Sequence, residues 1–187
     1  MNEQDSGGRN NMKTKAEIRQ ELRKQYASIS ETEWAERSRN LYSRILSEPL
    51  YRQAKSVFCY VSVKKEPDTR ALMQQILKDG KRLCVPRCKD DGSMEAVPVD
   101  DPEELKNGLF GIPEPPETVA PFQPDEIDLM IVPALAADAD GNRLGKGKGY
   151  YDRFLKGRRE GIWIVTFFMC DFPTEEHDVP GERVFCG

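Results

Sequence analysis

The sequence predicts an α/β protein in which a mainly parallel sheet carries helices on both faces. Short runs of apolar, β-branched and aromatic residues alternate along the chain with segments of helical periodicity. Such alternation favours parallel strands joined by helical crossovers. The length of 187 residues suits one domain with a full core, and we find no internal repeat or linker.

The N-terminal part of the chain is predicted to be helical. Residues 1–12 are polar and contain glycine, so we expect a disordered leader before a single domain of residues 13–187. Segment 14–26 has apolar side chains four residues apart, which indicates a first helix. A capping-box pattern beginning at Ser30 opens a second helix, which Pro49 ends.

The middle of the chain is predicted to supply strands. Segment 56–63 is rich in β-branched and aromatic residues, which favours a buried strand. A third helix of about ten residues follows, capped by Asp68 or Thr69. Segments 82–86 and 94–99 are predicted to be two further strands on either side of a turn.

The C-terminal half begins with a long loop. Segment 101–126 contains six prolines and little periodicity, and an ordered loop of that length inside a domain is usually functional. Segment 128–133 is the most apolar strand candidate. A helix near 150–158 and a strand at 162–168 complete the predicted alternation.

The overall charge limits the classes of partner. A net charge of −4 and a pI near 5.3 give no general attraction to nucleic acid or to an anionic membrane, and no apolar run is long enough to span a bilayer. Five cysteines without zinc-type spacing favour reduced thiols in a cytoplasmic protein, which we expect to be a monomer. Seven basic residues between 143 and 159 face one acid, so anion binding is expected there, and RNA contact by this run is a weaker alternative.

A glycine-rich loop lies within this basic run, between a predicted strand and a predicted helix. Gly145, Gly147 and Gly149 alternate with Lys146 and Lys148. Glycines let backbone N–H groups approach a ligand, and the following helix start and two ammonium groups add positive charge. The segment therefore predicts a polyphosphate cradle. It matches neither of the two common glycine-rich phosphate motifs, so a mobile basic loop in solvent is the alternative.

Four residues flank the cradle. Arg143 precedes it, and Tyr150, Tyr151 and Asp152 follow without a spacer. Asp152 in the first turn of a helix suits either the helix dipole or a Mg²⁺ ion that also contacts phosphate oxygens. The tyrosines are either packing residues or part of a ligand pocket.

The stretch from Val132 to Asp138, followed by that from Gly141 to Leu155, resembles the signature of the 5-formyltetrahydrofolate cyclo-ligase family, also called 5,10-methenyltetrahydrofolate synthetases. The resemblance covers roughly residues 13–180 and implies a three-layer α/β/α sandwich with a mainly parallel sheet. Four further segments occur in the family's order: Lys15 with Arg19, Lys65–Thr69, Gly111–Pro115 and Glu176-His177-Asp178.

This resemblance implies an enzyme that uses ATP and Mg²⁺. The formyl oxygen of 5-formyltetrahydrofolate, with or without a polyglutamate tail, would be phosphorylated. N10 would then attack the activated carbon, and phosphate would leave to give 5,10-methenyltetrahydrofolate. Such chemistry needs positioning and charge stabilisation and no protein nucleophile.

The resemblance also implies a set of site residues. Arg143 and Lys148 are the expected catalytic residues. Asp152 and Asp178 are the expected metal ligands. ATP is expected to contact Lys15, Arg19, Arg143, Leu144, Gly145, Lys146, Gly147, Lys148, Gly149, Tyr150 and Tyr151. The folate is expected to contact Val61, Glu66, Lys146, Gly147, Lys148, Gly149 and Tyr150.

Two departures from the family pattern support an alternative, a non-catalytic relative that binds folate or nucleotide. Ala137 stands where the family usually has a bulky aromatic, which leaves space for a void beside the cradle. The region from Ile164 to Pro173 is shorter than expected, and the C-terminal segment lacks the usual acidic-then-apolar ending.

Overall fold

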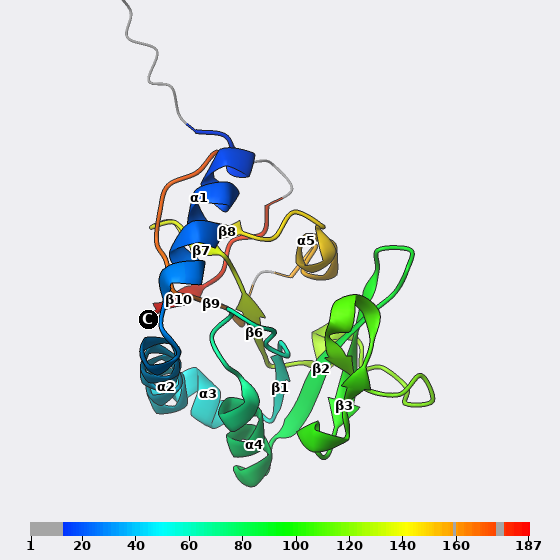
Figure 1. The fold of residues 1–187 in the computed structure, drawn as a ribbon. Helices are drawn as coiled ribbons and strands as arrows, with labels where there is room; N and C mark the ends of the chain where they lie inside the picture. Colours follow the sequence, from blue (N-terminus) through cyan, green and yellow to red (C-terminus); the bar gives the residue numbers. More distant parts are fainter. Residues whose placement is uncertain (1–12, 159, 175–177) are drawn as a thin grey trace, which may run out of the picture.

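The structure, a computed structural model, describes residues 13–158, 160–174 and 178–187 (Figure 1). The predicted leader, residues 1–12, and His177 lie outside the described residues. At the centre is a six-stranded sheet of order β10-β9-β6-β1-β2-β3, in which the β2–β3 pair alone is antiparallel. The strands are β1 (Ser56–Cys59), β2 (Arg82–Cys88), β3 (Met94–Val99), β6 (Leu129–Pro133), β9 (Ile162–Thr166) and β10 (Arg183–Cys186). The predicted α/β class with a mainly parallel sheet is confirmed.

The first three helices are bounded by the signals that the local sequence carries. Thr14 and Glu17 cap the first helix reciprocally, and the Ser30 hydroxyl accepts a hydrogen bond from the Glu33 backbone N–H. Pro49 ends the second helix and is also the first residue of the third, a position where the missing N–H of proline costs nothing. The helices are α1 (Lys15–Ser28), α2 (Glu31–Ser47), α3 (Pro49–Gln53), α4 (Arg70–Lys78) and α5 (Tyr150–Phe154).

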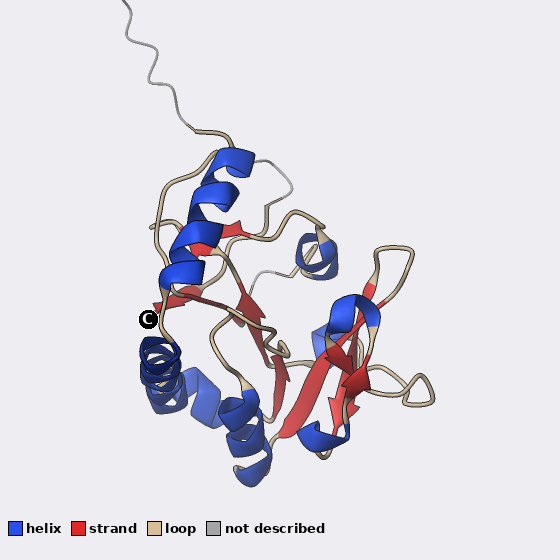
Figure 2. Ribbon diagram, viewed as in Figure 1, coloured by secondary structure: helices blue, strands red, loops and turns tan. Residues whose placement is uncertain are grey.

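The two faces of the sheet bury different sets of side chains. Along β1, Val57 and Cys59 point to one face and Phe58 to the other, as the two-residue period of a strand requires. Helices α1 to α4 cover the first face, and Figure 2 shows them gathered along one side of the sheet. The second face is covered by α5 and by loop residues such as Ile127. Cys59 and Cys84 are buried core residues.

Three elements are shorter than predicted, and one of them, strand β9, ends at Thr166, two residues before its predicted end. Strand β1 ends at Cys59, because the segment from Tyr60 onward leaves the sheet while remaining buried. Helix α5 ends at Phe154, four residues before the predicted end. Gly157, in a left-handed conformation at φ +87°, lies just beyond it.

Other elements were not predicted. β10 pairs in parallel with β9 and is only four residues long, so its short apolar run does not indicate a strand by itself. Two two-residue ribbons are also present, β4 (Lys106–Asn107) with β5 (Pro113–Glu114) and β7 (Ala136–Ala137) with β8 (Arg143–Leu144). The β4–β5 ribbon lies in the predicted long loop, which also contains the 3-10 turns Pro102–Glu104, Leu109–Gly111 and Pro124–Glu126.

None of the helices in the described part of the chain is long and apolar enough to span a membrane.

Candidate active site

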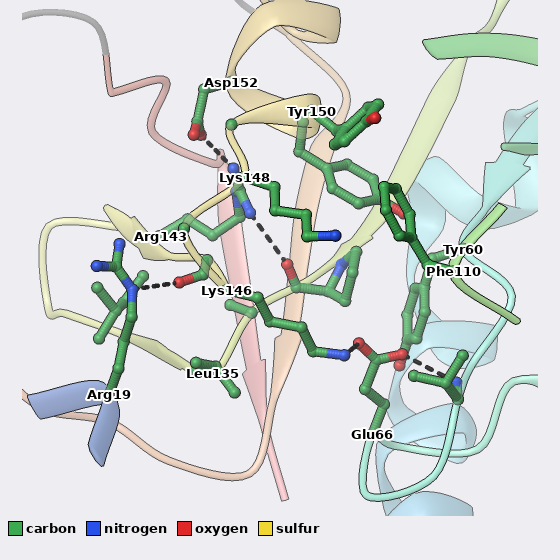
Figure 3. Close-up of a pocket in the computed structure, with 18 of the residues that line it drawn as sticks. Arg19, Tyr60, Glu66, Phe110, Leu135, Arg143, Lys146, Lys148, Tyr150 and Asp152 are labelled. Atoms are coloured by element: carbon green, nitrogen blue, oxygen red, sulfur yellow. Dashed lines mark hydrogen bonds and ion pairs between the residues drawn. The ribbon is translucent and has the colours of Figure 1, made fainter. Parts of the chain in front are cut away.

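A cavity of about 1000 Å³ opens at the carboxyl ends of the parallel strands, where ligands bind in open α/β sheets. The segments after β1 and β6, the start of α1, the glycine-rich loop and the loop at 110–112 form its walls (Figure 3). All fifteen site residues expected from the sequence line it: Lys15, Arg19, Val61, Glu66, Arg143, Leu144, Gly145, Lys146, Gly147, Lys148, Gly149, Tyr150, Tyr151, Asp152 and Asp178. Folding therefore brings the whole predicted set to one place.

The glycine-rich loop has the backbone geometry that its sequence predicts. It leaves β8 and reaches α5, whose N-cap is Gly149. Gly147 and Gly149 adopt left-handed conformations at φ +97° and +70°, which side chains disfavour. A Cβ atom at Gly145 would lie 2.9 Å from the Arg143 guanidinium, so this glycine allows a close approach. The glycine at position 145 therefore lets the loop backbone lie against the Arg143 guanidinium.

Arg143 is the most buried cation of the cavity, at 6% exposure. Its guanidinium donates to the Asp152 carboxylate and, over 3.4 Å, to the Pro133 carbonyl, and it lies 5.4 Å from the Tyr151 ring centroid. The Nε–H group is buried and has no hydrogen-bond partner within the part of the chain that the structure describes. Because a buried donor without an acceptor is costly, this group suits an acceptor supplied by a ligand.

The other cations are held by acids or carbonyls of the cavity. Lys146 Nζ lies 2.5 Å from a Glu66 oxygen, and the other Glu66 oxygen accepts the Val63 backbone N–H over 3.0 Å. Lys15 Nζ lies 2.9 Å from Asp178. Arg19 Nε donates to the Gly145 carbonyl over 2.8 Å, which ties α1 to the glycine-rich loop (Figure 3). These pairs keep the cations ordered and directed to the cavity.

Lys148 faces an aromatic residue from a distant loop. Its Nζ lies 3.2 Å from the ring centroid of Phe110, a cation–π contact, and the Tyr150 ring meets Phe110 edge-on at 5.7 Å. Phe110 is 52% exposed and has φ +60°, a conformation uncommon for a non-glycine residue. Sequence reasoning missed Phe110 as a site residue, although its position in the proline-rich loop marked the segment as functional.

Apolar and aromatic side chains form the remaining wall. Tyr60, Val61 and Leu135 are buried and line the cavity. The Tyr60 hydroxyl donates to the Pro67 carbonyl over 2.7 Å. Burial raises the pKa of both Tyr60 and Tyr151 well above the ordinary tyrosine value, so both rings stay neutral. Tyr60 was missed because its segment was assigned to a strand.

The expected metal ligands are placed in the cavity but do not form a cage by themselves. Asp152 is in the first turn of α5 and is paired with Arg143, and Asp178 is paired with Lys15. Among the described residues, no group of three or more His, Cys, Asp or Glu side chains is arranged to hold a metal ion. Mg²⁺ is commonly bound by one or two carboxylates with substrate phosphates and water, and this donor set fits that mode.

Ala137, beside which the sequence predicts space for a void, does not widen the cavity. Ala137 is fully buried, pairs with Arg143 in the β7–β8 ribbon and bridges to Met169. It is not among the residues that line the cavity. The C-terminal segment, the other departure from the family pattern, forms β10 and completes the sheet.

Comparison with known proteins gives a consistent result. The model of the 5-formyltetrahydrofolate cyclo-ligase family matches residues 11–186. The chain belongs to this family. The 5-formyltetrahydrofolate cyclo-ligase of Haemophilus influenzae is 31% identical over 182 residues, which cover 91% of this chain and 96% of the relative. The mouse protein of the same name is 28% identical over 183 residues, covering 89% and 90%.

Solved structures agree with the cyclo-ligase assignment. The NMR structure of Aquifex aeolicus 5,10-methenyltetrahydrofolate synthetase is 31% identical and superposes with a TM-score of 0.81, covering 92% of this chain and 89% of that one. A Mycoplasma pneumoniae 5,10-methenyltetrahydrofolate synthetase, at 19% identity, shares the fold with a TM-score of 0.74. The protein is therefore an α/β enzyme of the cyclo-ligase family.

Proposed function

We propose that this cyclo-ligase converts 5-formyltetrahydrofolate to 5,10-methenyltetrahydrofolate with ATP. The formyl oxygen forms a bond to the terminal phosphorus of ATP. The bond from that phosphorus to the bridging oxygen breaks, and ADP leaves. The N10 lone pair then forms a bond to the formyl carbon, the carbon–oxygen bond breaks to release phosphate, and N10 loses its proton. The observation that carries this proposal is one cavity in which a glycine-rich cationic loop faces an apolar aromatic wall.

The charged side of the cavity suits the nucleotide. Among the described residues, the buried Nε–H donor of Arg143 has no partner, and Lys148 and the residues of the glycine-rich loop line the same cavity. Donors fixed in a partly buried site stabilise the charge that moves onto the transferred phosphoryl group and the leaving phosphate. Arg143 and Lys148 are accordingly the proposed catalytic residues, with Lys15 and Arg19 as further ATP contacts.

The opposite side suits the folate. Val61 and Tyr60 present apolar and aromatic surface to the cavity, and Phe110 lines the same cavity. Glu66, fixed by the Val63 backbone and by Lys146, offers carboxylate oxygens to the N–H groups of a pterin ring. The ring system would lie between this wall and the residues from Lys146 to Tyr150, which then contact both substrates.

Asp152 and Asp178 are the proposed Mg²⁺ ligands. A bound Mg²⁺ would neutralise phosphate charge and orient the transferred group. In the structure Asp152 holds the Arg143 guanidinium and Asp178 holds Lys15, so each acid also positions a cation proposed to contact ATP. Loss of either acid therefore loosens a cation as well as removing a metal ligand.

The decisive experiment is an ATP-dependent cyclisation assay. Incubation of the protein with 5-formyltetrahydrofolate, Mg²⁺ and ATP should raise the near-ultraviolet absorbance as the methenyl product forms. A reaction without ATP is the control, and folded protein that gives no ATP-dependent change would refute the proposal. Calorimetric binding of both ligands without turnover would instead support a non-catalytic relative.

A further inference from the structure

A buried carboxylate lies behind the cavity wall and does not line the cavity. Glu114, in β5, is 8% exposed. One of its oxygens accepts the backbone N–H of Cys88 over 3.1 Å, and the other accepts the backbone N–H of Leu109 over 3.4 Å. Burying a carboxylate is expensive unless hydrogen bonds satisfy it, so a charged group at this place indicates a role that an apolar residue would not fill.

The first hydrogen bond anchors Glu114 to the central sheet. β1 pairs with β2 only as far as Phe58 and Cys84, so β2 continues for four residues beyond its parallel neighbour. Here the Glu114 carboxylate supplies the acceptor for the Cys88 N–H. The carboxylate acts on Cys88 in a second way. Burial first, and Glu114 next, raise the pKa of the Cys88 thiol to about 11, which keeps this cavity-lining group neutral.

The second hydrogen bond fixes the turn that carries Phe110. Leu109 begins this turn, and the Gly108 N–H to Ile112 carbonyl bond, 2.8 Å, closes it. A Cβ atom on Gly108 would overlap the Glu114 carboxylate, so glycine is required for this approach. Phe110 is thereby held at φ +60°, a conformation that surrounding contacts must maintain.

We propose that Glu114 is a positioning residue for the folate substrate. It clamps the turn at 108–112 onto the end of β2, and this clamp places the Phe110 ring against Lys148 at the cavity mouth. Glu114 does not touch the substrate itself. The inference rests on the proposed function, because it assumes that the folate ring system lies beside Phe110.

The test compares Glu114→Ala, Glu114→Gln and Phe110→Ala with the double variant Glu114→Ala/Phe110→Ala. Glu114→Ala should raise the KM for 5-formyltetrahydrofolate about 10-fold, the size of a lost aromatic contact, and should leave the KM for ATP within about 2-fold. Glu114→Gln keeps one carbonyl acceptor and should give a smaller rise. The double variant should resemble Phe110→Ala alone, because both changes remove the same contact.

An unchanged KM for the folate in Glu114→Ala would overturn the inference, and so would a double variant whose KM is the product of the two single effects. An equal loss in the affinities for folate and ATP would show a general structural role and would also overturn it. Calorimetric Kd values for 5-formyltetrahydrofolate separate this failure from that of the proposed function. A wild-type protein that binds folate without turnover refutes the reaction, yet the folate Kd of Glu114→Ala still decides the role of Glu114.

Discussion

The two ends of the parallel sheet each hold an arginine, Arg143 buried and Arg158 half-buried, and the two arginines differ in how their donors are satisfied. At the amino end, Arg158 donates to the carbonyls of Pro124, Ile127 and Glu160 over 2.5–2.8 Å. At the carboxyl end, Arg143 keeps a buried Nε–H that no described residue accepts. The Arg158 guanidinium donates from every nitrogen to backbone carbonyls and so holds loops together. The Nε–H of Arg143 can donate to a ligand.

The basic run between residues 143 and 159 looks uniform in sequence, but its residues lie in different places in the structure. Arg143, Lys146 and Lys148 line the cavity, whereas Arg158 binds the loop before β6. Arg153 bonds to the carbonyls of Gly92 and Lys148. The run is therefore not one continuous surface, which argues against the RNA-contact alternative.

The largest effect is expected at the carboxyl end, from Lys148→Ala. Removal of one fixed donor to a transferring phosphoryl group should lower kcat/KM by about 10²–10³-fold. The melting temperature should stay within about 2 °C, because the Lys148 ammonium contacts a cavity ring and not the core. Lys78→Ala, an exposed lysine at the end of α4, is the matched control and should retain wild-type kinetics. Equal losses in both variants would remove Lys148 from the site.

Asp152→Asn should have the next largest effect. The change keeps the shape of the side chain but removes the charge that holds Arg143 and is proposed to bind Mg²⁺. We expect kcat to fall about 10–10²-fold, with a higher Mg²⁺ concentration needed for half-maximal rate, and with circular dichroism unchanged. Wild-type kinetics in this variant would leave Asp152 with the helix-dipole role alone.

Arg158→Ala should show the opposite pattern. Loss of several charge-assisted bonds to backbone carbonyls should lower the free energy of unfolding by about 2 kcal/mol and the melting temperature by about 4–8 °C. At 25 °C the kcat/KM should stay within about 2-fold of wild type. Calorimetry and the cyclisation assay measure the two quantities. A large loss of activity without a loss of stability would break the distinction between the two ends.

The smallest effect concerns Asp128, also at the amino end. Burial of its carboxyl acts to raise the pKa, but hydrogen bonds from the Lys55 and Ser56 backbone outweigh burial and lower the pKa below its ordinary value. The charged form therefore stabilises the fold above about pH 4, the unfolded value, and this stabilisation is lost as the pH falls through the lower folded value. Asp128→Asn should flatten the fall in melting temperature below about pH 4. An unchanged acid profile would contradict this role.

The charged half of the site was predictable because its residues are neighbours in sequence. The run from Arg143 to Asp152 stays together in any fold, and its alternating glycines and lysines predict phosphate binding, with a mobile basic loop as the alternative. The aromatic half was not predictable in the same way. Tyr60 and Phe110 come from separate segments, and nothing local distinguishes a buried cavity residue from a core residue.

The strands, too, were predictable only where the local sequence carries a clear signal. Strand β6, with two buried faces, carries an apolar run that the sequence reveals, and its bounds were predicted to within a residue. The edge strand β10 has only three consecutive apolar residues, of which one is buried, and such a short run does not indicate a strand. The apolar residues after Cys59 were assigned to a strand, because hydrophobicity does not show whether a side chain packs in a sheet or lines a cavity.

The bond from Arg19 to the Gly145 carbonyl joins residues 126 positions apart in the chain. During synthesis on the ribosome, Arg19 is therefore made long before the glycine-rich loop of the proposed nucleotide site. Contacts of such long range form late in folding, since the intervening chain must first be ordered. Ligands that bind both segments will recognise only the finished protein and, by mass action, protect the whole domain from unfolding.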